Sequence, residues 1–139
     1  MRELSELVSL QQPLVMPHTA SVKTACQHMA QRRVGSVLVI DESGALVGIF
    51  TGRDAVGRVI AAGKTAARTS LRTVMTPDPA TMNSQQTAID ALRLMWDGGF
   101  RHVPVVDDGK IRGVVARGDF KADEQDCLES ERALWEHMR

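Results

Sequence analysis

The chain has 139 residues, with 17 Lys plus Arg against 17 Asp plus Glu, so its formal net charge at pH 7 is zero. A neutral chain has no overall field that would attract nucleic acid or an acidic membrane, and a bound anion must meet a local cluster of donors. The composition, 43% hydrophobic and 24% charged, is ordinary for a soluble globular protein, and no apolar run approaches the roughly 18 residues of a membrane span.

Residues 1–12 are expected to be an N-terminal flanking segment. Met1–Leu10 alternates charged and apolar residues, which allows a short helix but lacks the continuous apolar core of a secretory signal. We therefore expect a cytoplasmic protein. Cys26 and Cys127 are far apart in the sequence, and neither they nor the scattered histidines have the spacing of metal ligands. Neither a disulfide framework nor a metal site is expected.

Residues 13–63 carry a first complete set of elements. Apolar residues at helical spacing predict a helix over residues 21–33, with Ser21 as its N-cap. A strand, a turn, a strand and a helix are expected to follow, at residues 36–40, 41–44, 46–50 and 52–62. The next stretch, residues 64–79, is rich in Thr, Ala and Pro, which predicts a linker.

Residues 80–125 carry a second set of elements in the same order. A helix is expected over residues 87–97, then two strands joined by a tight turn, and a second helix that begins near Arg117. Residues 126–139 follow as a C-terminal amphipathic helix. Its expected apolar positions are Leu128, Leu134, Trp135 and Met138.

The two sets are copies of one unit. Met29, Val37, Val39 and Asp41 recur, at constant spacing, as Met95, Val103, Val105 and Asp107. One copy of roughly 50 residues would bury too little surface to be stable alone, so two copies are expected to share a core. The expected fold is α/β (α+β), two β-α-β-β-α repeats packed about a pseudo-two-fold axis, with a groove for each copy.

The end of the second strand in the first copy, Gly48–Asp54, is the first candidate site. The N–H groups of a helix N-terminus, the Thr51 hydroxyl and Arg53 can meet a phosphate. The carboxylate of Asp54 can accept from the paired hydroxyls of a ribose. A second interpretation stays open, because Thr-x-x-Asp is also close to a capping box that only stabilises the helix.

The corresponding residues of the second copy, Gly113–Asp119, keep the aspartate but carry Ala116 in place of the threonine. This change predicts unequal grooves, the second poorer in phosphate donors. Arg101, His102 and Arg117 are further candidates for phosphate contacts, since Arg forks onto phosphate and a protonated His donates to it. A solvated Arg beside a packed His is the alternative.

These motifs, taken in order and twice, resemble a tandem pair of cystathionine β-synthase (CBS) domains, an arrangement called a Bateman module. The resemblance covers about residues 13–121. The residues that carry it are Arg33–Asp41 and Gly48–Asp54 in the first copy, and Val74–Pro77, Phe100–Asp107 and Gly113–Asp119 in the second.

The resemblance implies binding of adenosine-containing ligands such as AMP, ADP, ATP or S-adenosylmethionine, usually by a disc-like homodimer. It implies ribose contacts for Asp54 and Asp119, phosphate contacts for Thr51, Arg101 and His102, and a place near the adenine for Val15 and Gly35. It also implies regulation of an unidentified partner protein. Ala116 departs from the usual Ser or Thr, which puts a phosphorylated ligand in the second groove in doubt.

We therefore predict a nucleotide-sensing module, which requires no cofactor and has no catalytic residues. The alternative is a dimerisation or interaction protein with vestigial grooves. An enzyme is disfavoured because the sequence shows no nucleophile–base pair and no metal cluster.

Overall fold

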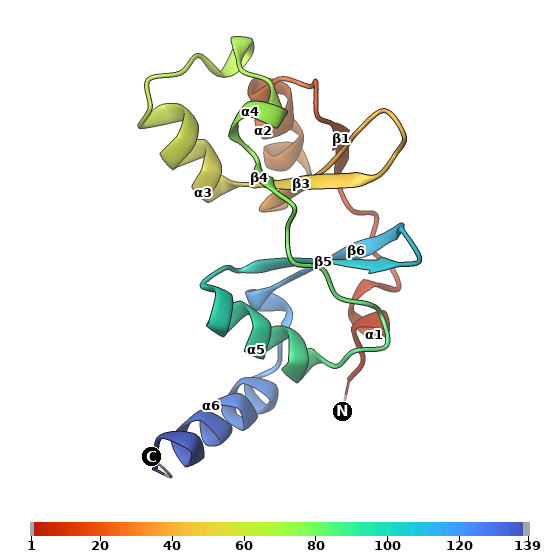
Figure 1. Cartoon of the computed structure of the whole chain (residues 1–139), viewed down its shortest axis with the longest axis vertical. Helices are drawn as coiled ribbons and strands as arrows, with labels where there is room; N and C mark the ends of the chain where they lie inside the picture. Colours follow the sequence, from red (N-terminus) through yellow and green to blue (C-terminus); the bar gives the residue numbers. More distant parts are fainter. Residues whose placement is uncertain (1, 138–139) are drawn as a thin grey trace. The chain divides into compact units, whose positions relative to one another are not determined.

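The computed structural model describes residues 2–137, which form two compact units (Figure 1). The first unit consists of residues 12–80 and contains the first repeat. The second unit consists of residues 2–11 and 81–137, and contains the second repeat. The mixed helices and strands of each unit agree with the predicted α+β fold.

A four-stranded sheet organises the first unit. Its strands, in the order in which they lie, are β1 (Val15–Pro17), β2 (Ser36–Ile40), β3 (Leu46–Thr51) and β4 (Thr76–Pro77). β1 runs parallel to β2, and the other neighbours are antiparallel. The continuous apolar run of β2 is explained by its position inside the sheet, where all but its last residue are buried.

The helix between β1 and β2 is α2 (Val22–Arg32), and its limits follow from local chemistry. The Ser21 hydroxyl oxygen accepts the N–H of Thr24 at 3.1 Å, which caps the N-terminus. Arg33 ends the helix in the left-handed region, at φ 54°. The buried face of α2 then packs into the core of the first unit together with β2 and β3.

After β3 the chain turns directly into a second helix. α3 (Gly52–Asp54) continues as η1 (Ala55–Ile60), in which wider, π-type turns replace the α-helical ones. Gly63, at φ 72°, follows the helix in the left-handed conformation that the sequence predicted for its end. The side chains of Val56 and Ile60 are exposed on this helix.

Residues 64–79, expected to be a linker, are folded against the first unit. They contain η2 (Ala66–Arg68), α4 (Leu71–Val74) and β4. Leu71 and Val74 are buried in the core, and β4 pairs with β3. Their Thr- and Pro-rich composition hid the signal, which is a pair of apolar residues three positions apart on one short helix.

The second unit is built on the hairpin of β5 (His102–Asp107) and β6 (Lys110–Ala116). The tight turn between them places Asp108 at φ 50° and Gly109 at φ 79°, which suits a hairpin of two central residues. Met82 lies beside β5 in a parallel bridge to Val105. Its N–H donates to the carbonyl of Pro104 at 3.1 Å. This bridge takes the place that β1 has in the first unit.

The N-terminal residues belong to the core of the second unit, although the sequence suggested a flanking segment. α1 (Leu4–Val8) forms there, and Leu4 is fully buried. The Leu4 N–H donates to the carbonyl of Gln86 at 2.8 Å, just before α5 (Ala88–Gly98). No local pattern predicts this packing, because the partners are far apart in the sequence.

The helix expected near Arg117 is a short 3-10 turn, η3 (Arg117–Asp119), and the long helix α6 (Ala122–His137) begins after it. Leu128 is the buried apolar residue of the predicted amphipathic face, whereas Leu134 and Trp135 are 62% and 69% exposed. Met138 lies outside the described residues. Among residues 2–137, no helix combines the length and the apolar character needed to cross a membrane.

Candidate functional site

In the first unit, the predicted site residues gather at one end of the sheet. Thr51 ends β3 and lies opposite Ser36, the first residue of β2, which Gly35 precedes. Val15 begins β1 and pairs with Leu38, two positions further along β2. Since α3 starts directly after Thr51, its first residues also lie at this end of the sheet.

Asp54 is the most constrained of these residues, with only 7% of its surface exposed. Its Oδ2 accepts the Thr51 N–H at 2.9 Å and the Thr51 hydroxyl at 3.2 Å, and its own N–H donates to the Thr51 hydroxyl oxygen at 3.4 Å. These contacts form the capping box that the sequence allowed. Capping is therefore one role of Asp54, but capping does not exclude a ligand.

The two carboxylate oxygens of Asp54 differ in how they are used. Oδ2 is held by Thr51, whereas Oδ1 has only long contacts, 3.4 Å to the Thr76 hydroxyl and 3.6 Å to Nε of Arg58. A carboxylate oxygen can accept more than one hydrogen bond, so Oδ1 retains capacity for a further donor. Arg53, next to it in α3, has an exposed side chain.

The corresponding aspartate of the second unit has a different environment. Asp119 is exposed, and its Oδ2 accepts the N–H of Ala116 at 2.7 Å. Ala116 has no hydroxyl to accept an N–H in return, so only half of a capping box forms. The turn that follows has three residues, where the first unit has α3 and η1.

Arg101 and His102 stand at the start of β5, where His102 pairs with Ala116 across the hairpin. Arg101 is exposed and His102 is half-buried. Burial lowers the pKa of His102, and the positive charge of Arg101 lowers it further, whereas the carboxylate of Asp119 acts in the opposite direction. The imidazole is therefore held toward its neutral form.

Arg117 is committed to contacts inside the second unit. Its guanidinium carbon lies 5.1 Å from the ring centroid of Trp96, and its Nη2 donates to the carbonyl of Phe100 at 3.3 Å. Arg132 from α6 also lies over the Trp96 ring, at 5.0 Å. Nε of Arg117 is buried and has no hydrogen-bond partner among the described residues. A phosphate contact would require this stacked guanidinium to move.

The sequence prediction missed the residues that surround the two aspartates. Thr76 and Arg58 contact Asp54, and Thr76 belongs to a motif that carried the family resemblance, so a signal existed. Arg2 contacts the turn at Asp119, and nothing in the sequence indicated it. Across residues 2–137, no group of three or more His, Cys, Asp or Glu side chains is placed to hold a metal ion.

Comparison with known proteins gives consistent matches. The family model "CBS domain" matches residues 4–61 and again residues 71–122. The CBS domain-containing protein CBSCBSPB3 of Arabidopsis thaliana is 41% identical over 102 residues, which are 73% of this chain and 18% of that protein. The chain therefore spans less than a fifth of the length of this relative.

Solved structures share the fold. A CBS domain protein of Pyrobaculum aerophilum, complexed with AMP, matches with a TM-score of 0.80 and 24% identity over 92% of this chain and 98% of that one. A CBS-domain-containing protein of Agrobacterium tumefaciens matches with a TM-score of 0.77 and 28% identity over 84% of this chain and 89% of that one.

Proposed function

The chain belongs to the CBS domain family, and from this premise we propose that it is a regulatory module that binds an adenosine-containing ligand and signals to a partner protein. The observation that carries the proposal is the Asp54 carboxylate. It is nearly buried, oriented by Thr51, and retains acceptor capacity at Oδ1. Val15 and Gly35 lie at the same end of the sheet.

A ribose fits this carboxylate chemically. Its two neighbouring hydroxyls are donors, and hydrogen bonds to an ionised acceptor are roughly twice as strong as neutral ones. A carboxylate fixed in advance by Thr51 loses little further freedom when the ligand binds. The proposal assigns the Thr51 hydroxyl and Arg53 to a phosphate, and the surroundings of Val15 and Gly35 to the base.

The ligand class is adenine nucleotides, namely AMP, ADP or ATP, or else S-adenosylmethionine. The AMP complex of the Pyrobaculum aerophilum protein supports the nucleotide at the level of the fold. We expect the first unit to bind a phosphorylated ligand better than the second, because Ala116 supplies no hydroxyl and Arg117 is stacked on Trp96. In this proposal no cofactor is required, no reaction is catalysed and the setting is cytoplasmic.

Self-association and a partner protein complete the proposal. The exposed apolar side chains of Val56 and Ile60 in the first unit, and of Leu134 and Trp135 in the second, favour a homodimer or a docked partner. The alternative function is a dimerisation protein with vestigial sites. The complete capping box at Thr51 and Asp54 favours it, because capping alone gives that aspartate a role.

A thermal-shift screen, followed by calorimetry, separates the two functions. The protein is heated with AMP, ADP, ATP or S-adenosylmethionine, and GMP serves as the control for base recognition. A ligand at about 100 times its dissociation constant is expected to stabilise the fold by roughly 2.7 kcal/mol. If none of the four adenosine compounds shifts the melting temperature or gives binding heat, the vestigial-site alternative holds.

A further inference from the structure

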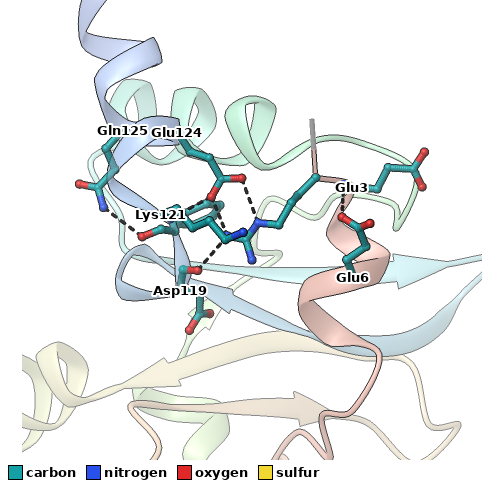
Figure 2. Close-up of polar contacts among 8 residues, drawn as sticks. Glu3, Glu6, Asp119, Lys121, Glu124 and Gln125 are labelled. Atoms are coloured by element: carbon teal, nitrogen blue, oxygen red, sulfur yellow. Dashed lines mark hydrogen bonds and ion pairs between the residues drawn. The ribbon is translucent and has the colours of Figure 1, made fainter.

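Arg2 lies where three segments of the second unit meet. Its backbone carbonyl accepts the N–H of Ala88 at 2.9 Å, so the residue is anchored at the start of α5. Its side chain reaches the start of α6, where Nη2 donates to Oε1 of Glu124 at 2.6 Å and Nε donates to Oε2 at 3.1 Å. Figure 2 shows this two-pronged contact beside the turn that holds Asp119.

The same guanidinium also holds the turn. Nη2 of Arg2 donates to the backbone carbonyl of Asp119 at 3.2 Å (Figure 2). Glu124, with a side chain only 8% exposed, accepts the N–H of Lys121 at 2.8 Å as well. The hydrogen bond from Arg2 holds the pKa of Glu124 below its ordinary value, which keeps the carboxylate charged. A buried, bidentate pair of this kind is strong and directional.

We propose that Arg2 is a positioning residue, which fixes the Asp119 turn and couples it to the attachment of α6. The ligand part of this inference rests on the proposed function. Asp119 supplies the ligand contact, and Arg2 acts through it. The juxtaposition that carries the proposal is one guanidinium shared between the Asp119 carbonyl and the Glu124 carboxylate.

The second unit needs such support because its turn has lost the local one. In the first unit the Thr51 hydroxyl accepts the Asp54 N–H and donates to its carboxylate. Ala116 can do neither, and the turn is further loosened by Gly118, whose backbone is freer than that of other residues. Arg2 therefore provides from a distant segment what the missing hydroxyl provided within the motif.

Coupling to α6 follows from thermodynamic reciprocity. A ligand that binds the Asp119 carboxylate orders the turn and so strengthens the Arg2 contacts to its carbonyl and to Glu124. The start of α6 is then held more firmly, and anything that loosens the Arg2 contacts weakens the ligand by the same factor.

The first test needs no ligand. Amide hydrogen exchange is measured on the full chain as the unaltered protein, R2Q, R2K and R93Q. R93Q is the matched control, because Arg93 holds α6 through Glu131 at 2.7 Å and has no contact with the turn. We expect R2Q to raise exchange at residues 116–125 by about tenfold, R2K to be intermediate, and R93Q to affect α6 alone. Unchanged exchange at residues 116–121 in R2Q overturns the positioning role.

The second test uses AMP as the probe, titrated calorimetrically into proteins that carry D54N to remove the first-unit site. Binding that D119N abolishes is expected to weaken about fivefold to tenfold in R2Q and to stay unchanged in R93Q. An R2Q affinity equal to that of its parent overturns the coupling. If the unaltered protein binds no AMP, the proposed function fails and the ligand coupling falls with it, while faster turn exchange in R2Q still supports the positioning role.

A label on α6 reports the coupling directly. Replacement C26S leaves Cys127, exposed on α6, as the single thiol for a nitroxide. In the unaltered background AMP is expected to reduce the mobility of this label, and R2Q is expected to remove that response. A response that persists in R2Q contradicts the coupling through Arg2.

Discussion

The strand-to-helix junctions of the two units start from one seven-residue pattern and end in different structures. Gly48–Asp54 leads into a helix with a nearly buried aspartate, whereas Gly113–Asp119 ends in a short turn with an exposed one. The capping position differs by one hydroxyl, Thr51 against Ala116. Duplicated motifs can therefore keep their acid while its support moves from a neighbour in sequence to a residue across the fold.

The largest effect is expected from the core beneath the first junction. Phe50 is fully buried directly before Thr51, so Phe50→Ala removes a ring and leaves a cavity. We expect a loss of about 3–5 kcal/mol in the free energy of unfolding, measured in urea. The matched change in the second unit is Val115→Ala, which removes fewer atoms and should cost less. Equal losses would show that the two junctions are packed with equal density.

The next effect separates capping from binding at Asp54. Asp54→Asn keeps an oxygen to accept the Thr51 N–H but removes the charge. We expect the affinity for AMP to fall at least tenfold, on the order of 1.5–3 kcal/mol, with a small shift in the ligand-free melting temperature. Asp119→Asn should have a weaker effect on AMP, since its motif lacks the threonine.

Asp90→Asn is the control for this change, because Thr87 and Asp90 form the same capping box at the start of α5. Asp90 Oδ2 accepts the Thr87 N–H at 3.1 Å, and the Asp90 N–H donates to the Thr87 hydroxyl oxygen at 3.3 Å. Its replacement should leave AMP binding intact. A protein with Asp54→Asn that melts earlier but binds AMP normally would return Asp54 to capping alone.

Exchanging the capping residues tests the comparison itself. Thr51→Ala removes a satisfied cap and should cost about 0.5–2 kcal/mol of stability. Ala116→Thr offers a hydroxyl to the Asp119 N–H and should stabilise the second junction by up to about 1 kcal/mol. Urea unfolding of both variants gives the two values. Destabilisation by Ala116→Thr would mean that the contacts of Arg2 have replaced the cap and no longer accommodate it.

The smallest effect is a slope with pH. The pKa of His102 is lowered in the folded state, so between about pH 6.5 and that lower value the unfolded chain binds more protons. The stability associated with a neutral His102 is complete above about pH 6.5 and declines as the pH falls through the folded-state pKa. Urea unfolding from pH 8 to pH 5 should show this decline in the unaltered protein, and His102→Gln should reduce it. Parallel curves would remove His102 as its source.

Much of the fold follows from the sequence because its signals are local. The helical spacing in α2 and the alternation and turn residues of the β5–β6 hairpin depend on neighbours within a few positions, and the repeat doubles each signal. The confirmed family assignment rests on the same motifs. By contrast, the burial of Leu71 and Val74 depended on a tertiary surface that no short window contains.

The candidate site was less predictable, and the reason is distance along the chain. The sequence indicated both aspartates and the threonine, but it could not indicate that Thr76 contacts Asp54 or that Arg2 contacts Glu124. The stacking of Arg117 on Trp96 was missed because each residue has another plausible role when it is considered alone. Side chains that look free in the sequence are occupied once the fold brings their partners.

The second unit is discontinuous in the chain, since residues 2–11 fold with residues that come after position 80. On a ribosome, α1 would leave the exit tunnel long before Gln86 or Ala88, its partners, had been made. The first unit, a continuous segment, can fold during that wait. Leu4 must remain unburied until the second repeat follows at about 5–20 residues per second. Assembly of the second unit is thus tied to late synthesis, and an excised 81–137 segment would lack part of its own core.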